Sequence, residues 1–251
     1  MNTPIHVAVL GASGRMGSEA VKAINNAEDL RLAATVGSAD PMEKMLDGDA
    51  SVIVDLTTPE ASKKHVQFAI EHGLHAVVGT SGWDEMALVP VRKQLEDHPD
   101  VGVLIAPNFA LGSVLASAFA AKAARYFESA EIVELHHPNK LDAPSGTAVR
   151  TAELIAAERR RAGLNQSPDA TLHELPGARG ADVQGVRVHA VRSRGLVAHQ
   201  EVIFGAEGEQ LTIRHDSFDR ASFMPGVLLG IRNVVNRPGL TYGLDGYLDL
   251  D

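Results

Sequence analysis

Short apolar runs alternate with amphipathic stretches through the first part of the chain. The first run, residues 5–10, is bounded by Gly11, as expected of a buried parallel strand. The helical stretch that follows places Met16, Ala20 and Ile24 on one face. Further strands are predicted at 30–36, 51–56, 76–79 and 101–105, and helices near 59–72 and 84–96. Strands that alternate with helices predict a doubly wound parallel sheet.

The pattern changes after Asn108. Apolar spacing predicts helices at 111–127, 147–161 and 223–236, and strands at 131–136, 186–192, 199–204 and 210–215. Residues 163–185 are rich in Gly, Pro, Asn and Asp and predict a long loop, whereas Gly205 and Gly208 predict a turn and Pro238 begins a tail. These strands predict a mixed or antiparallel sheet.

The chain therefore divides into two predicted domains. The first is an α/β domain with a Rossmann-type parallel sheet at residues 1–107, to which residues 218–251 return through the last helix. The second is a smaller α+β domain at residues 108–217. No segment repeats, and no tract has low complexity.

Composition narrows the possible functions. The net charge of −9 argues against nucleic acid or an anionic membrane as the main partner, although a local cationic pocket can still bind an anion. The absence of cysteine excludes disulfides, thiolate metal sites and dehydrogenases that use a cysteine nucleophile. No apolar run reaches the roughly 18 residues that span a bilayer, and the start of the chain does not resemble a signal peptide. We expect a cytoplasmic protein.

A glycine-rich turn joins the first predicted strand to the first helix. Its spacing is G-x-x-G-x-x-G from Gly11 to Gly17, and Gly14 lets the backbone approach a pyrophosphate. The helix start offers N–H donors to phosphates. A glycine turn without a ligand is the alternative, but the position at the start of a strand–helix–strand unit favours a dinucleotide site.

Two later loops follow predicted strands, at the edge where open α/β sheets bind ligands. Either loop alone is typical of an ordinary turn, and Arg15 alone is typical of a solvated residue at a helix start. Together the three segments indicate one cofactor cleft. The candidate cofactor-binding residues are Gly11, Ala12, Ser13, Gly14, Arg15, Met16, Gly79, Thr80, Ser81, Ala106, Pro107, Asn108 and Phe109.

The densest cluster of chemically active residues lies at 134–148, between a strand and a helix. His136 and His137 can exchange protons near neutral pH, and Lys140 carries a positive charge. The helix start beyond them carries the hydroxyl residues Ser145 and Thr147, which suit a carboxylate ligand. The cluster predicts an anionic substrate that is protonated during the reaction.

Simpler interpretations of this cluster also exist. Two histidines and a lysine are typical of a polar loop, and Ser145 is typical of a helix cap. A metal site is not expected, because adjacent histidines on a strand point to opposite faces and cysteine is absent. A triad of Ser145, His136 and Asp142 is disfavoured, because the G-x-S-x-G elbow is missing.

Residues 134–148 resemble the signature of the dihydrodipicolinate reductase family, E-x-H-H-x-x-K-x-D-A-P-S-G-T-A, at every fixed position. The glycine loop, Asp-Leu-Thr-Thr-Pro at 55–59, the loop at 79 and Ala-Pro-Asn-Phe at 106–109 follow the family order. The resemblance covers nearly the whole chain. The segment Leu-Pro-Gly-Ala-Arg-Gly-Ala at 175–181 is similar to the actinobacterial branch.

The resemblance implies an NADH- or NADPH-dependent reduction of 4-hydroxy-tetrahydrodipicolinate in lysine and diaminopimelate synthesis. It implies that His136 donates or accepts a proton and that Lys140 donates one to the substrate, a small dicarboxylate. It implies that His137, Gly146 and Thr147 bind the carboxylates, with Ser145 assisting. It also implies a homotetramer built from the sheet of the second domain.

Two other functions compete with this one. A nicotinamide oxidoreductase for another oxo-acid or sugar is compatible with the glycine loop but not with the 134–148 signature. A nucleotide-sensing protein without activity has no need for Lys140 beside two histidines.

The end of the second strand bears on the choice of nicotinamide. An acid about 20 residues beyond the glycine loop commonly bonds the ribose 2′-OH of NADH. Here Gly37 stands in that place, followed by Ser38, and Lys44 is the nearest downstream cation. Asp40 can alternatively reach back to restore the NADH contact. The sequence predicts use of both cofactors within about 100-fold, with a mild preference for NADPH.

Overall fold

The computed structural model describes residues 3–250, which form two compact units. The first unit combines the chain up to Leu111 with the segment from Arg220 onward, and the second is Gly112–Asp219. The boundaries predicted from the sequence were 107/108 and 217/218. Each unit has its own sheet.

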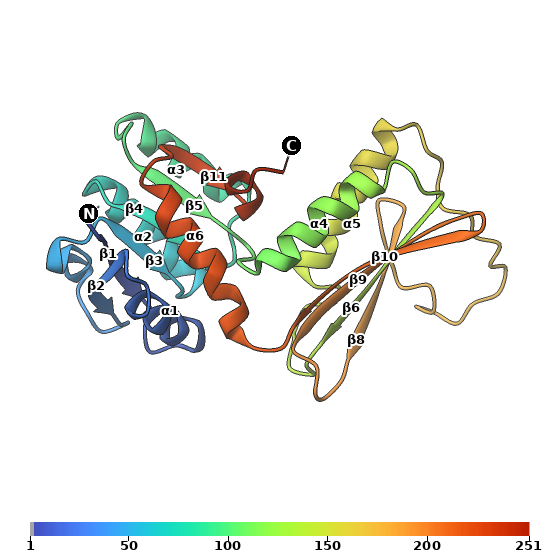
Figure 1. The fold of residues 1–251 in the computed structure, drawn as a ribbon, viewed down its shortest axis with the longest axis horizontal. Coiled ribbons are helices and arrows are strands. Elements are labelled where there is room, and N and C mark those ends of the chain that lie inside the picture. Colours follow the sequence, from blue (N-terminus) through green and yellow to red (C-terminus); the bar gives the residue numbers. More distant parts are fainter. Residues whose placement is uncertain (1–2, 251) are drawn as a thin grey trace. The chain divides into compact units, whose positions relative to one another are not determined.

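The first unit contains a six-stranded parallel sheet in the order β11-β5-β4-β3-β1-β2 (Figure 1). The expected Rossmann-type sheet is confirmed. Its strands are β1 (Ile5–Leu10), β2 (Leu30–Val36), β3 (Val52–Asp55), β4 (His75–Val78), β5 (Gly102–Ile105) and β11 (Gly239–Tyr242). Its helices are α1 (Arg15–Asn25), α2 (Pro59–Glu71), α3 (Glu85–Glu96) and α6 (Met224–Val234), with short 3-10 helices η1 (Met42–Asp49), η2 (Arg220–Phe223) and η3 (Leu244–Tyr247).

Helices cover both faces of this sheet, because its strands are apolar on both sides. On β1, Ala8 and Leu10 belong to the core that α2 and α3 complete, whereas Val7 and Val9 point to the other face. On that other face, α6 packs against α1 and against β4 and β5. The carboxyl ends of the parallel strands therefore meet at one edge, which is where the predicted cofactor loops lie.

The second unit contains a mixed five-stranded sheet in the order β10-β9-β6-β8-β7, in which only β6 and β8 run parallel. The strands are β6 (Ser129–His136), β7 (Ala181–Val183), β8 (Val186–Arg192), β9 (Ala198–Ala206) and β10 (Glu209–Ser217). The helices α4 (Leu111–Ala123) and α5 (Gly146–Arg161) lie on the same side of the sheet (Figure 1). Small residues such as Ala120 and Ala152 let both helices join one core with Ile132 and Phe204.

Several sequence predictions of elements were wrong. The expected tail after Pro238 contains β11, and the expected loop at 163–185 contains β7. Both strands have at most four residues, too few for a periodic signal. Gly205 lies inside β9 rather than in a turn, and the helix expected to reach residue 127 ends at Ala123. The predicted boundaries of β1, β2 and β8 are confirmed.

Candidate active site

A ladder of backbone hydrogen bonds connects the loops at the carboxyl edge of the first sheet. Each loop donates an N–H to the last or near-last carbonyl of the neighbouring strand. The bonds are Gly11 N to Val36 O (2.9 Å), Leu56 N to Leu10 O (3.2 Å), Gly79 N to Asp55 O (2.9 Å) and Ala106 N to Val78 O (2.9 Å). The glycine loop, the loop at 79 and the loop at 106 are thereby fixed along one edge, as the sequence analysis expected of a cofactor cleft.

The first and third glycines of the turn are required by its geometry. Gly11 has a φ of +75°, and a Cβ there would lie 2.7 Å from the carbonyl oxygen of Leu56. A Cβ on Gly17 would overlap the Gly11 carbonyl. The close packing of α1 against the loop therefore depends on both glycines.

The start of α1 fits a phosphate group. Gly14 is the N-cap of α1 and provides no side-chain acceptor, and the first turn carries no acidic residue. The first-turn N–H groups of a helix have no intrahelical acceptor, and the helix dipole favours an anion there. The uncapped start of α1 is therefore suited to a dinucleotide pyrophosphate.

The other candidate cofactor residues differ in exposure. Ser13, Arg15, Ser81 and Pro107 are exposed, and Met16 is half-buried. Thr80, Ala106 and Phe109 are buried in the unit. Asn108 accepts a hydrogen bond from Ala110 N at 2.9 Å, which fixes the turn after β5.

Asp55 organises the loops after β3 and β4, a role that was not predicted from the sequence. It is fully buried at the end of β3, and its Oδ1 accepts bonds from Thr57 N (3.0 Å), Thr57 Oγ1 (2.7 Å) and Thr80 Oγ1 (2.8 Å). Its Oδ2 lies 2.8 Å from His65 Nδ1. Burial raises the pKa of Asp55, but the bonds from His65, Thr57 and Thr80 outweigh it and lower the pKa. An ionised Asp55 therefore holds the loops after β3 and β4 together.

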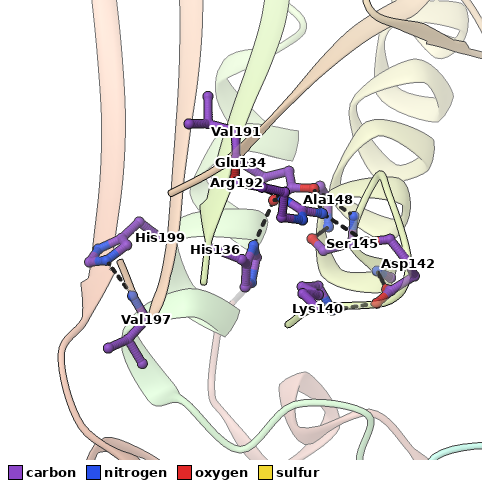
Figure 2. Close-up of polar contacts among 11 residues, drawn as sticks. Glu134, His136, Lys140, Asp142, Ser145, Ala148, Val191, Arg192, Val197 and His199 are labelled. Carbon is purple, nitrogen blue, oxygen red and sulfur yellow. Dashed lines mark hydrogen bonds and ion pairs between the residues drawn. The ribbon is translucent and has the colours of Figure 1, made fainter. Parts of the chain in front are cut away.

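The second unit brings His136 and Ser145 of the 134–148 cluster, together with Arg192, around one buried carboxylate (Figure 2). Glu134 is fully buried on β6. Its Oε1 accepts bonds from Ser145 N (3.0 Å) and Arg192 Nη2 (2.7 Å). Its Oε2 accepts bonds from Arg192 Nη1 (2.7 Å) and His136 Nδ1 (2.6 Å). Glu134 thus connects the strand, the start of α5 and the end of β8.

These contacts determine the protonation of Glu134 and His136. Burial raises the pKa of Glu134, but the bonds and charges of Arg192 and His136 outweigh it and lower the pKa. Burial lowers the pKa of His136, the nearby charges of Lys140 and Arg192 lower it further, and Glu134 offsets only part of the effect. His136 is therefore mainly neutral at pH 7. Because an ionised Glu134 only accepts, the His136 proton is on Nδ1 and Nε2 keeps its lone pair.

Lys140 and the start of α5 converge on a carboxylate. Lys140 Nζ donates to Asp142 Oδ1 at 2.7 Å (Figure 2). The backbone N–H of Gly146 donates to Asp142 Oδ2 at 3.2 Å. The Asp142 side chain is 55% exposed, so this interaction is at the surface of the unit. A Cβ added to Gly146 would meet no atom within 4 Å. Gly146, which was predicted to bind a substrate carboxylate, and Lys140, which was predicted to donate a proton, therefore hold a carboxylate already, with open space beside Gly146.

The remaining candidates occupy distinct positions. Ser145 is the N-cap of α5, since its Oγ accepts from Ala148 N at 3.2 Å, and its side chain is buried. Thr147 is half-buried in the first turn of α5, and its carbonyl accepts from Thr151 Oγ1 at 2.8 Å. Within residues 3–250, the Nδ1 atom of His137 is buried and has no hydrogen-bond partner. A buried polar atom of this kind usually binds water or a ligand.

The roles of Glu134, Asp142 and Arg192 were not predicted from the sequence. The first two lie inside the signature, but nothing in their spacing indicated the contacts. Arg192 ends β8 and pairs with His136 across the parallel ladder. Finding it required the pairing of two strands about 55 residues apart in the chain. In the described part of the chain, no group of three or more histidines and acidic residues could hold a metal ion.

No helix among residues 3–250 combines the length and the apolar character needed to cross a membrane.

Comparisons with known proteins cover both units. The family model "Dihydrodipicolinate reductase, N-terminus" matches residues 5–109, and "Dihydrodipicolinate reductase, C-terminus" matches residues 112–248. A 4-hydroxy-tetrahydrodipicolinate reductase of Streptomyces griseus is 60% identical over 247 residues, which cover 98% of this chain and 99% of the relative. One from Nocardia farcinica is 59% identical over 246 residues, with the same coverage of 98% and 99%.

A solved structure is similar over the same extent. It is a dipicolinate-bound dihydrodipicolinate reductase from Paenisporosarcina sp. TG-14, with a TM-score of 0.86 and 37% identity. The match covers 98% of this chain and 100% of that one. An amine dehydrogenase from Mycobacterium smegmatis, 12% identical with a TM-score of 0.63, shares the fold alone.

Proposed function

The chain belongs to the dihydrodipicolinate reductase family, and from this premise we propose how its own residues carry out the reaction. The reaction is the reduction of 4-hydroxy-tetrahydrodipicolinate to tetrahydrodipicolinate with NADH or NADPH, a step of lysine and diaminopimelate synthesis. The substrate is a small dicarboxylate. We place the reaction in the cytoplasm, where the reduced nicotinamide pool lies.

The glycine loop and the two later loops would hold the nicotinamide nucleotide. Its pyrophosphate would accept N–H groups from the start of α1, and the ladder of backbone bonds keeps the loops after β4 and β5 in line with it. When bound, the reduced nicotinamide supplies a hydride to the substrate. Net conversion adds a hydride and a proton and releases the 4-hydroxyl group as water, so the protein has to deliver the proton.

One observation carries the assignment of the chemical site: Lys140 Nζ and Gly146 N donate to the same surface carboxylate, that of Asp142. A substrate carboxylate can replace Asp142 on these donors, since Asp142 is more than half exposed. Thr147 and the unpartnered Nδ1 of His137 supply further polar contacts for the dicarboxylate. Ser145 assists by capping α5 and fixing the direction of its first N–H groups.

Lys140 is the proton donor in this proposal, and His136 is a proton acceptor. The Lys140 ammonium lies close enough to affect the pKa of His136, and the free Nε2 of His136 can take up a proton. Glu134 acts through His136 by fixing its orientation and tautomer, and Arg192 balances the charge of Glu134. Glu134 and Arg192 are therefore positioning residues.

Reduced-nicotinamide absorbance tests the function directly. The product of the preceding synthase step is generated in the cuvette, and the full chain is added with NADH or NADPH. We expect absorbance to fall only when the synthase product is present. Turnover of other oxo-acids or sugars, but not of this product, would favour the competing oxidoreductase. Nucleotide binding without any turnover would favour the nucleotide sensor.

A further inference from the structure

The end of β2 is the place where an acid commonly selects NADH. The last carbonyl of β2, Val36 O, accepts the N–H of Gly11 at 2.9 Å. Gly37, the next residue, therefore lies beside the first glycine of the nucleotide loop. It has no side chain, so the strand itself contributes no carboxylate to the ribose of a bound nucleotide.

Asp40 brings a carboxylate back to this position. Its Oδ2 accepts the N–H of Gly37 at 2.8 Å, and its own N–H donates to Gly37 O at 3.2 Å. The bond from Gly37, with that from Lys44, lowers the pKa of Asp40, so the side chain is ionised at neutral pH. Within residues 3–250 the second oxygen, Oδ1, makes no hydrogen bond. This oxygen is a free acceptor next to the end of β2.

Lys44 places a cation on the same carboxylate. Its Nζ donates to Asp40 Oδ2 at 3.0 Å, and both side chains are 35% exposed. An ionised carboxylate binds the two hydroxyls of an NADH ribose and repels the 2′-phosphate of NADPH. An ammonium group attracts that phosphate. The two neighbouring side chains therefore have opposite effects on the choice of nucleotide.

We propose that Asp40 is the ribose-recognising acid of this chain in place of Gly37, and that Lys44 beside it admits the 2′-phosphate, so that the pair sets cofactor choice. The proposal rests on the proposed use of a nicotinamide nucleotide. The mild preference for NADPH was expected because the end of β2 lacks an acid. If Asp40 supplies that acid, this reason for a preference no longer applies. Comparable binding of NADH and NADPH follows from the opposing charges.

Dissociation constants measured by calorimetry, without substrate, test the pair independently of turnover. Asp40→Asn retains an oxygen acceptor for Gly37 N–H but loses the charge. We expect it to weaken NADH binding about tenfold and to strengthen NADPH binding severalfold. Lys44→Met should weaken NADPH binding about tenfold and leave NADH binding within about twofold. The same opposite trends are expected for 5′-ADP and 2′,5′-ADP, which lack the nicotinamide.

Two further variants complete the test: one controls for the change in net charge, and one restores a carboxylate at the end of β2. Asp47→Asn makes the same charge change at an exposed position of η1 and should alter neither constant. Gly37→Asp in the Asp40→Asn background should restore NADH binding, since a Cβ at Gly37 meets only the Asp40 carboxylate, at 3.5 Å. An unchanged NADH-to-NADPH ratio in Asp40→Asn would overturn the inference while leaving the function intact. Failure of the unmodified chain to bind either nucleotide would overturn both this inference and the proposed function.

Discussion

At the scale of single residues, Glu134 connects three residues of the candidate site. Its two oxygens accept bonds from Ser145, from both terminal nitrogens of Arg192 and from His136. The carboxylate raises the pKa of His136 against the stronger effect of burial. Removal of its charge should therefore change the titration of His136 as well as its position.

We predict that Glu134→Gln lowers the pKa of His136. The wild-type pKa already lies below the ordinary value, and the variant loses the one group that raises it. If neutral His136 is the active form, kcat/KM falls as the pH drops through this pKa, and that acid limb should move to lower pH in the variant. Titration of the His136 ring signals by NMR checks the direction without substrate.

Glu131→Gln is the matched control for this variant. Glu131 lies on the same strand and also contacts an arginine and a histidine, Arg179 and His189, but it does not contact His136. Its substitution should leave the His136 titration unchanged. A His136 pKa that stays constant or rises in Glu134→Gln would contradict the assigned role of Glu134.

Residues whose side chains are reactive in themselves could be predicted from the sequence. Residues whose role depends on their contacts in the fold could not. His136 and Lys140 are recognisable because imidazole and ammonium groups exchange protons wherever they lie. Arg192 carries the same charge as many surface arginines, and only the parallel pairing of β6 with β8 makes it a partner of Glu134. Asp40 was foreseen only as an alternative, since a turn had to bring it back to Gly37.

At the scale of elements, the sheet of the second unit has two different faces. Its core face is covered by α4 and α5. The opposite face carries the half-buried Val133, Leu135 and Ile203, and Val191, which is 38% exposed. Among the described residues of this unit, no helix packs on that face. The same face also carries charged side chains, among them Glu131, Glu201 and Arg214, so it is mixed in character. A sheet face that no helix of its own unit covers is suited to contact with other copies of the chain.

We propose a homotetramer built on this face. Light scattering at micromolar concentration should give about four times the chain mass of 26.6 kDa. Ile203→Arg, which replaces an apolar residue of this face with a long charged side chain, should reduce the measured mass. Val89→Arg, at a 58%-exposed apolar residue of α3, is the control and should not. A monomer in the unmodified protein would count decisively against the proposal.

Long elements with strong periodicity were predictable, and short ones were not. The apolar run of β1 and the helical spacing of α1 extend over enough residues for a clear pattern. In contrast, β11 is four residues long and depends on pairing with β5, whose partner residues lie 137 positions earlier in the chain, as in Gly239 and Gly102. Such a strand is specified by its partner rather than by its own sequence.

At the scale of the whole molecule, nucleotide binding and proton transfer are assigned to different units. The loops proposed to hold the nucleotide belong to the first unit, and the residues proposed to handle the proton belong to the second. This division follows from the sequence order of the motifs, so nucleotide binding and chemistry should be separable by mutation. The central claim is that residues 134–148 perform the chemistry of the reductase.

The most direct test of that claim is the turnover of Lys140→Ala beside its nucleotide affinity. We predict a kcat lower by about 10²–10⁴-fold, the usual value of a general acid, with NADH and NADPH dissociation constants within about twofold of the wild type. Lys122→Ala, at the only other lysine of the second unit, is the matched control and should retain near-native turnover. Near-native kcat in Lys140→Ala would contradict the account.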